Sequence, residues 1–148
     1  MSLHKETVGL AGEYAVASEL CKRGMYTQLT LGNKKRTDLL VEVGDNFIKV
    51  EVKSKQEGTW PAVKGISREN YLLVFVDFQD KKPEERPDFY ILSVADWKKL
   101  VIIKSKKDPT MVIDKDSVPT WPGISWKGIG VKPENISKFK EKWDKFSF

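Results

Sequence analysis

The sequence predicts an α+β fold, in which helices pack on a four-stranded sheet that is mostly antiparallel or mixed. Three observations predict this fold class. Residues 5–22 carry apolar side chains at helical spacing. Four segments between residues 37 and 94 carry the alternating or continuous apolar runs that are typical of strands. A second helical segment follows them, so the order along the chain is helix, four strands, helix.

The first helix is predicted over residues 5–22, KETVGLAGEYAVASELCK, and Gly24 ends it. At about 100° per residue, Glu13 falls inside the apolar stripe of this helix, whereas Glu19 falls on its polar side. A carboxylate that points toward a core costs free energy unless it is paired or binds a metal ion. Glu13 therefore needs either a lysine partner or a cation.

Two strands follow, over residues 37–43 (TDLLVEV) and 47–53 (FIKVEVK), and the sequence GDN between them is typical of a hairpin turn. The segment 56–70 shows no strand pattern. The nearly continuous apolar run at 71–78, YLLVFVDF, predicts a central strand. After a polar, proline-bounded loop, the run 88–94, DFYILSV, predicts a fourth strand.

Ser93 and Asp96 have the spacing of a capping box, which predicts a second helix that begins at this point. After Lys107 the chain becomes rich in proline and glycine. A last helix is predicted over residues 132–146, from the helical spacing of four apolar residues in that segment. Those four residues are Ile136, Phe139, Trp143 and Phe146.

The composition is that of a globular chain, with 40% hydrophobic and 32% charged residues among 148. We expect a single domain over residues 1–148, with a core at about 5–107 and a C-terminal extension at about 108–148. No apolar run reaches the roughly 18–20 residues of a membrane span, so no membrane association is expected. The single cysteine, Cys21, excludes an internal disulfide framework and fits a cytoplasmic protein.

The scarcity of histidine restricts the chemistry that this chain can perform. Its one histidine is His4, which excludes serine triads, Cys–His pairs and histidine-rich metal sites. Catalysis would therefore use carboxylates, lysines and a hard cation. Lys and Arg number 26 against 21 acidic residues, for a net charge of +5. That charge permits a polyanionic partner such as nucleic acid without requiring one.

The predicted hairpin has a defined register. Apolar residues occupy odd positions in the segment 39–43 and even positions in the segment 48–52. A two-residue turn at 44–45 places both sets on one face of the sheet, and a register slip of two residues would preserve that arrangement. The polar residues of both strands then share the other face.

Three charged residues converge on that polar face. The two-residue turn places Asp38 directly across from Glu51, and Lys53 lies two residues further along the same strand. A register slip would instead place Asp38 across from Lys53. Two facing carboxylates repel each other, so a lysine, a cation or solvent must compensate for their charge. A solvated hairpin face and a metal site are the two interpretations of this cluster.

These residues resemble a known motif. The sequence TD at Thr37 and Asp38 and the sequence EVK at residues 51–53, together with Glu13 on the first helix, resemble the PD-(D/E)xK nuclease superfamily. This superfamily includes restriction endonucleases and archaeal Holliday-junction resolvases. The likeness covers residues 9 to about 100, although Thr37 replaces the proline of the signature and the usual helix between the third and fourth strands is missing.

The resemblance implies a restriction-endonuclease-like core and an endonuclease that hydrolyses phosphodiester bonds in DNA with Mg²⁺ or Mn²⁺. It implies that Asp38 and Glu51 bind the cation, helped by the backbone carbonyl of Val52 and by Glu13. Lys53 corresponds to the catalytic lysine of the superfamily. Gln56 corresponds to the glutamine that some branches place just after this lysine. Glu51 and Asp38 are counted with Lys53 and Gln56 as the catalytic set.

Two further residues are candidates for substrate contact: Lys55, and Trp60 in the glycine-containing segment that follows the hairpin. The lysines at 98–107 are either a solvated helix face or nonspecific phosphate contacts. A domain of this size has little room for its own recognition module, so a homodimer or a partner protein is expected. The alternatives to a nuclease are a catalytically inactive nuclease-fold protein that serves as a nucleic-acid-binding or assembly module, and an interaction domain unrelated to nucleic acid.

Overall fold

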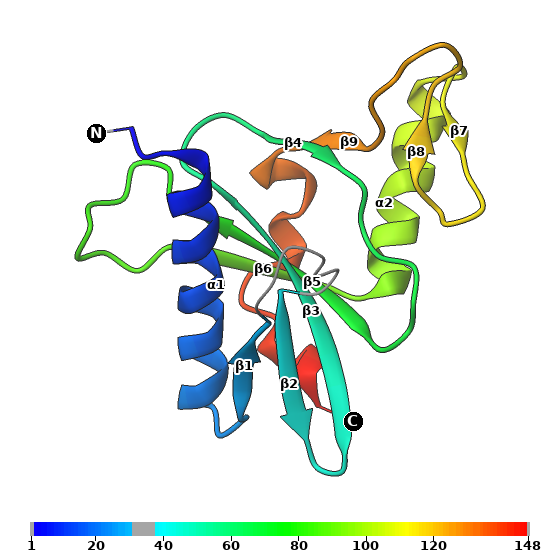
Figure 1. The fold of residues 1–148 in the computed structure, drawn as a ribbon. Helices are drawn as coiled ribbons and strands as arrows, with labels where there is room; N and C mark the ends of the chain where they lie inside the picture. Colours follow the sequence, from blue (N-terminus) through cyan, green and yellow to red (C-terminus); the bar gives the residue numbers. More distant parts are fainter. Residues whose placement is uncertain (1, 31–37, 148) are drawn as a thin grey trace.

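A computed structural model describes residues 2–30 and 38–147, so Thr37 lies outside the described residues. It shows a mixed five-stranded sheet with helix α1 across one face and helix α2 on the other (Figure 1). The strand order is β1-β2-β3-β5-β6, in which β3 and β5 are parallel and all other neighbours are antiparallel. The α+β fold class is confirmed, and the sheet gains a fifth strand because β1 pairs with β2.

The elements of this core have the following bounds: α1 Lys5–Lys22, β1 Thr27–Leu29, β2 Leu39–Val43, β3 Asn46–Lys55, β5 Tyr71–Asp77, β6 Asp88–Leu92 and α2 Val94–Lys107. The first helix has its predicted bounds. The second begins as predicted, because the Ser93 hydroxyl accepts a hydrogen bond from the Asp96 N–H and the Asp96 carboxylate accepts one from the Ser93 N–H. Among the described residues, neither α-helix has the length and apolar character needed to span a membrane.

Two small sheets lie beside the core. Strand β4 (Trp60–Val63) falls in the segment that showed no strand pattern and pairs with β9 (Ile129–Val131). Strands β7 (Val112–Ile113) and β8 (Pro119–Thr120) form a hairpin that stands out from the molecule beside α2 (Figure 1). These pairings involve the C-terminal extension, which the local sequence pattern did not assign to strands.

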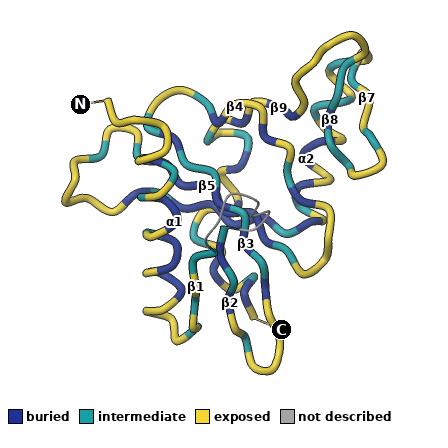
Figure 2. The backbone as a smooth tube through the Cα atoms, viewed as in Figure 1, coloured by how far each residue is buried: buried dark blue, intermediate teal, exposed yellow. Residues whose placement is uncertain are grey.

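An apolar cluster covers each face of the main sheet, and the buried positions follow the middle of the strands while the β2–β3 hairpin tip is exposed (Figure 2). On the first face, α1 contributes Val16 and Leu20 against Val50 and Val52 of β3. On the second face, α2 packs through Trp97 together with residues of β4 and β9. The even-numbered side chains of β3 from Ile48 to Val52 therefore point into the cluster under α1.

Helix α1 approaches β3 very closely at Gly12. A Cβ atom on Gly12 would lie 1.7 Å from the Ser54 Oγ. Glycine lowers helix propensity by roughly 1 kcal/mol relative to alanine, but here the missing Cβ lets the helix lie directly against the Ser54 side chain. This contact fixes α1 on the face of the sheet to which the even-numbered residues of β3 point.

The predicted helix at 132–146 is wrong. The segment forms three short 3-10 helices, η1 Pro133–Asn135, η2 Ser137–Phe139 and η3 Trp143–Phe146. Ile136 and Phe139 pack in the cluster under α2, whereas Trp143 and Phe146 pack in the cluster under α1. The segment passes along the edge strand β6, where Tyr90 bridges to Lys140 and the Glu141 N–H donates to the Phe89 carbonyl. Packing on both faces of one sheet overrides the helical spacing.

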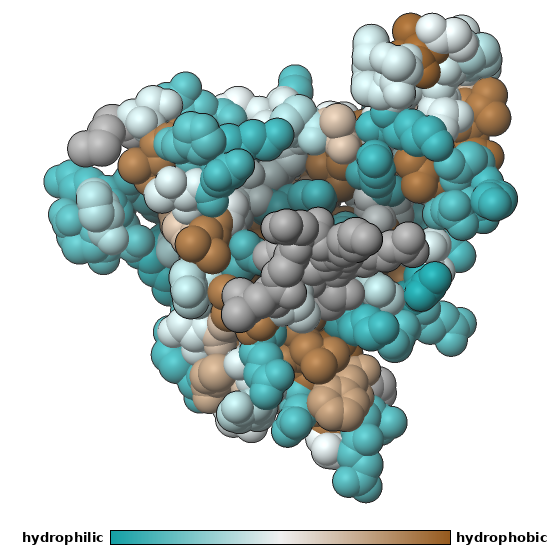
Figure 3. Space-filling view, viewed as in Figure 1, coloured by the Kyte–Doolittle hydropathy of each residue, from teal (hydrophilic) through white to brown (hydrophobic). Residues whose placement is uncertain are grey.

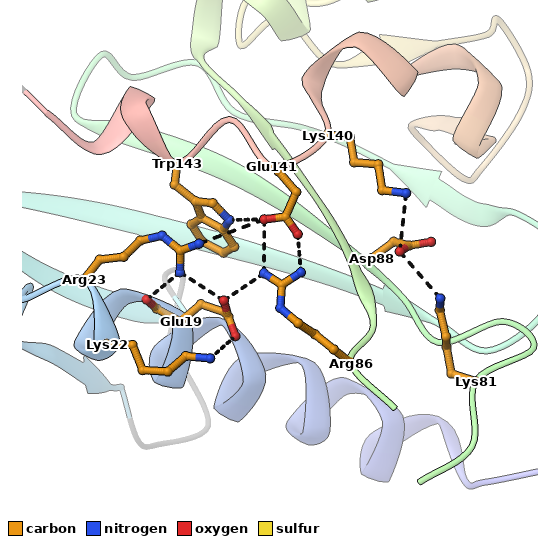
Figure 4. A network of polar contacts seen from close by, with 9 residues as sticks. All are labelled: Glu19, Lys22, Arg23, Lys81, Arg86, Asp88, Lys140, Glu141 and Trp143. Carbon is orange, nitrogen blue, oxygen red and sulfur yellow. Dashed lines mark hydrogen bonds and ion pairs between the residues drawn. The ribbon is translucent and has the colours of Figure 1, made fainter. Parts of the chain in front are cut away.

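A network of charged residues ties this C-terminal segment to α1 (Figure 4). Glu19 accepts hydrogen bonds from Lys22 at 2.6 Å, Arg23 at 2.9 Å and Arg86 at 2.8 Å. Arg86 also binds the Glu141 carboxylate through both of its terminal nitrogens. Glu19 thus lies on the polar side of α1, as predicted, but its side chain is only 7% exposed because residues distant in sequence cover it.

This network predicts acid sensitivity. Burial alone would raise the pKa of Glu19, but hydrogen bonds from Arg86, Lys22 and Arg23 outweigh it and lower the pKa from 4.5 to about 2. The unfolded chain then binds this proton more readily than the folded one, so stability present above pH 4.5 is lost as the pH falls toward 2. We expect Glu19→Gln to remove a contribution on the order of 1–3 kcal/mol at pH 7.

The measurement is urea unfolding of both proteins from pH 7 to pH 2. Glu19→Gln should show a flatter loss of stability in the acid range than the wild type. The control is Glu6→Gln, which changes an exposed glutamate in the first turn of the same helix. Parallel pH curves for wild type and Glu19→Gln would contradict the assignment.

Candidate active site

The β2–β3 hairpin has the predicted register. Gly44 and Asp45 form the two-residue turn, Val43 pairs with Asn46, and Leu39 pairs with Val50. Gly44 adopts a φ of 60°, which glycine accommodates without strain. Because Val50 and Val52 point into the cluster under α1, Glu51 and Lys53 point to the opposite face of the sheet, as expected.

Asp38 lies just before β2 and is bound to β3 through both its backbone and its side chain. Its N–H donates to the Val50 carbonyl at 3.0 Å, and its Oδ2 accepts a hydrogen bond from the Val52 N–H at 2.7 Å. The Asp38 carboxylate thus provides a hydrogen-bond acceptor for a main-chain N–H at the open end of the β2–β3 hairpin. The other carboxylate oxygen, Oδ1, has capacity for further ligands.

Glu51 lies in an electrostatically crowded position. Burial raises the pKa of its carboxyl group, and the charge of Asp38 raises it further, while Lys53 and Lys64 act in the opposite direction. The structure therefore brings together the three charged residues predicted from the hairpin, and it adds Lys64. Glu51 also lines a pocket of about 240 Å³, which gives its carboxylate access to a ligand.

These oxygen atoms suit a hard divalent cation. The carboxylates of Asp38 and Glu51 are close enough for one to raise the pKa of the other, and a bound cation would relieve that repulsion. Within residues 2–30 and 38–147, no group of three or more His, Cys, Asp or Glu side chains could hold a metal ion. A site here would use two carboxylates and the Val52 carbonyl, and Mg²⁺ accepts such a set because it retains several water ligands.

Glu13 is buried on α1, as its place in the apolar stripe predicted. Helix α1 covers the face of the sheet that holds Val50 and Val52, whereas Glu51 points to the other face. Glu13 does not complete a group of three acidic side chains with Asp38 and Glu51 in the described structure. The two-carboxylate set is therefore the one on which a functional proposal can rest.

Gln56 follows β3 and lies on the side of α1. Its Oε1 accepts a hydrogen bond from the Leu3 N–H at 2.9 Å. It lines a separate cavity of about 310 Å³, together with Val8 and Ala11 of α1 and residues after β5. This geometry does not bring Gln56 to the Glu51 pocket, so its predicted catalytic role gains no support.

The two residues predicted to contact substrate are both in the interior. The Lys55 side chain is 3% exposed and forms an ion pair with Asp77 at 2.9 Å and a hydrogen bond with Gln79 at 2.8 Å. Trp60 is 1% exposed, and its Nε1–H donates to the Val76 carbonyl at 3.2 Å. Both side chains are therefore enclosed on the α2 side of the sheet, and their predicted contact with substrate gains no support.

The residues that surround Glu51 in space come from segments that sequence reasoning did not connect with the hairpin. The pocket is lined by Gly65, Ile66, Ser67 and Arg68 from the connection before β5, by Tyr71 at the start of β5, and by Asp116 from the β7–β8 turn. This connection is fixed by close packing, since a Cβ atom on Gly65 would lie 1.9 Å from Trp97 Nε1 of α2. Only the basic residues of the segment, Lys64 and Arg68, were a signal that sequence reasoning could have used.

The position of Lys64 predicts a change in the acidity of Glu51. Because the Lys64 charge lowers the pKa of Glu51, Lys64→Ala should raise that pKa and move the acid limit of Mn²⁺ binding to higher pH. The measurement is Mn²⁺ affinity as a function of pH. The control is Lys106→Ala, which removes an exposed lysine of α2 that does not line this pocket. Superimposable pH curves for Lys64→Ala and wild type would contradict the assignment.

No protein-family model matches this sequence, and no curated protein matches it. Two solved structures are similar in fold. A bacterial homing endonuclease is 22% identical with a TM-score of 0.47, over 62% of this chain and 70% of that chain. The Holliday junction resolvase Hjc of the archaeal hyperthermophile Archaeoglobus fulgidus is 17% identical with a TM-score of 0.39, over 59% of this chain and 78% of that chain.

Proposed function

We propose that this protein is a metal-dependent nuclease that hydrolyses phosphodiester bonds in DNA. The observation that carries the proposal is the convergence of Asp38, Glu51 and Lys53 at the end of the β2–β3 hairpin, beside a pocket open to ligand. These are the residues that the PD-(D/E)xK resemblance assigns to catalysis. The surroundings add further positive charge from Lys64 and Arg68, which favours a phosphate group.

Each residue has a defined task in this proposal. Asp38 and Glu51 hold Mg²⁺ or Mn²⁺ with the Val52 carbonyl, and the Val52 N–H keeps the Asp38 carboxylate in place. When bound, the cation polarises a phosphoryl oxygen and lowers the pKa of its water ligand. Lys53 places an ammonium group where negative charge develops on the phosphate in the transition state. The repulsion between the two carboxylates is the reason that they favour a cation.

The experiment that tests the proposal is Mn²⁺ titration calorimetry on the wild type and on Glu51→Ala, with DNA cleavage assayed on the same preparations. Cleavage is measured on duplex, junction, flap and single-stranded substrates. We expect the wild type to bind Mn²⁺ and to cleave at least one substrate, and we expect Glu51→Ala to lose both. The matched control is Glu42→Ala, which changes an exposed glutamate of the same hairpin.

The outcomes separate the proposal from its alternatives. Circular dichroism of Glu51→Ala establishes that the variant remains folded. An absence of Mn²⁺ binding in the wild type would contradict the proposal and reduce the cluster to a charged hairpin face. A nuclease-fold module that binds DNA without catalysis would then be the better account, and salt-dependent DNA binding would identify it.

A further inference from the structure

The C-terminal extension forms a groove with α2 that is separate from the Glu51 pocket. The groove has a volume of about 610 Å³. Its lining combines apolar and aromatic side chains with lysines, and the main contributors are Ile103, Lys104, Lys107, Met111, Trp121 and Trp126. Most of these residues lie beyond the part of the chain that resembles the nuclease superfamily. The proposed catalytic chemistry uses none of them.

The aromatic side of the groove is built around two tryptophans. Trp121 is half-buried and held in orientation, because its Nε1–H donates to Asp108 Oδ2 at 2.8 Å. Trp126 is 61% exposed, in contrast to the buried Trp60, Trp97 and Trp143. Apolar side chains also lie on the outside of the β7–β8 lobe, beside hydrophilic side chains that lie over α2 (Figure 3). An exposed indole ring of this kind offers a flat surface for stacking.

The cationic side of the groove concentrates positive charge. Burial lowers the pKa of Lys104, and the nearby charges of Lys132 and Lys107 lower it further, whereas Glu134 opposes them. Lys104 is anchored by a hydrogen bond of 2.7 Å from its Nζ to the Gly130 carbonyl. The two lysine charges that act on Lys104 favour an anionic occupant at this side of the groove. Lys107 is exposed at the groove and can reach such an occupant.

The floor of the groove is rigidly packed. Gly128 has a φ of 97°, and a Cβ atom there would lie 2.6 Å from the carbonyl carbon of Ala62. Ala62 itself lines the groove and has a φ of 48°, which is uncommon for a residue with a side chain. Ala62 lies in β4, and Gly128 comes directly before β9, which pairs with β4. The close approach of these two residues shapes the groove beside α2.

The groove and the Glu51 pocket are connected by shared segments of the chain. Ala62 lines the groove, and the chain reaches the Glu51 pocket three residues later, at Gly65. The extension contributes Trp121 and Trp126 to the groove and Asp116 to the pocket. Both sites lie on the side of the sheet that α2 covers. The groove and the Glu51 pocket are thus built from the same two segments of the chain.

We propose that this groove binds a single-stranded segment of nucleic acid, with a base stacked on Trp126 and backbone phosphates at Lys104 and Lys107. Stacking on an aromatic ring combined with lysine contacts to the backbone is the means by which proteins bind single strands. This proposal rests on the proposed nuclease function in one respect only: it names single-stranded nucleic acid as the substrate of the Glu51 site. Binding itself needs no metal ion and no cleavage.

The test measures fluorescence anisotropy of a fluorescein-labelled oligothymidylate of about 20 nucleotides, with the full-length protein in EDTA. We expect Trp126→Ala to weaken binding by at least about fivefold, the lower end of the effect of one stacked base. Lys107→Glu should weaken binding and reduce its salt dependence by about one phosphate contact. Two controls, Lys106→Glu on α2 and Tyr14→Ala on α1, change exposed residues outside the groove and should alter binding by less than about twofold.

Several outcomes would overturn this proposal. They are an absence of oligonucleotide binding in the wild type, unchanged binding in Trp126→Ala, an equal effect of Lys106→Glu and Lys107→Glu, or equal competition by a duplex of the same length. If the nuclease function failed, cleavage and Mn²⁺ binding would be absent while the Trp126-dependent binding in EDTA persisted, so the two failures are distinguishable.

Discussion

Replacing Lys53 with methionine is expected to lower the rate of DNA cleavage by about 10²–10³-fold, the cost of removing one group that stabilises charge in a transition state. Lys53 points to the same face as Glu51 and is close enough to lower the pKa of that carboxyl group. Its ammonium group is therefore beside the carboxylates that are proposed to hold the cation. Methionine retains an unbranched side chain of nearly the same length and removes the ammonium group.

The rate is measured from pH 6 to pH 9, because Lys53→Met also raises the pKa of Glu51 and would shift the acid limb of the profile. The loss should persist on the plateau, where Glu51 is ionised in both proteins. The matched control is Lys49→Met, which removes a lysine from the same face of the same strand, beside Tyr71. A plateau rate within about threefold of the wild type would contradict the catalytic role of Lys53.

The hairpin that carries these residues could be predicted from the sequence because its determinants are local. The alternation of apolar residues along 39–43 and 48–52 and a two-residue turn at Gly44 and Asp45 fix the register, and the register fixes the face of Glu51. The capping box at Ser93 is local in the same sense. Each of these features depends only on residues a few positions apart.

The residues around the hairpin could not be predicted because distant packing places them. Lys64 is close to Glu51 because Gly65 allows the connection between β4 and β5 to lie against Trp97. The spacing of the residues in 132–146 suggested one apolar helix face, but those residues are divided between two cores. Their periodicity is that of a helix, and only the position of β6 decides that the segment passes along its edge.

Charged residues mislead sequence reasoning when their partners are distant in sequence. Glu19 lies on the polar side of an isolated α1, but Arg86 and the C-terminal segment cover it. Lys55 lies at the end of an amphipathic strand and close in sequence to the residues proposed for catalysis, but Asp77 on the neighbouring strand holds it in the interior. Charge near an active site therefore does not establish contact with substrate, and burial has to decide.

The burial of Lys55 predicts that replacing this residue affects stability strongly, rather than DNA binding. Lys55→Met is expected to lower the free energy of unfolding by about 3–5 kcal/mol, because it leaves the Asp77 carboxylate buried without its cation. The Asp77 side chain is 11% exposed and keeps only the Gln79 N–H as a donor among the hydrogen bonds described for it. The measurement is urea unfolding at pH 7, with affinity for DNA measured on the folded variant.

Two comparisons make this prediction specific. The double variant Lys55→Met with Asp77→Leu should recover most of the lost stability, since an apolar pair of similar volume often replaces a buried ion pair without net cost. Lys81→Met, which removes one partner of the more exposed pair between Lys81 and Asp88, should cost less than about 1 kcal/mol. If Lys55→Met instead left stability unchanged and weakened DNA binding, Lys55 would contact substrate and its burial would not describe the functional state. The structure favours the first result, because Lys55 is enclosed between Asp77, Gln79 and the Trp60 ring, whose centroid lies 5.0 Å from its Nζ.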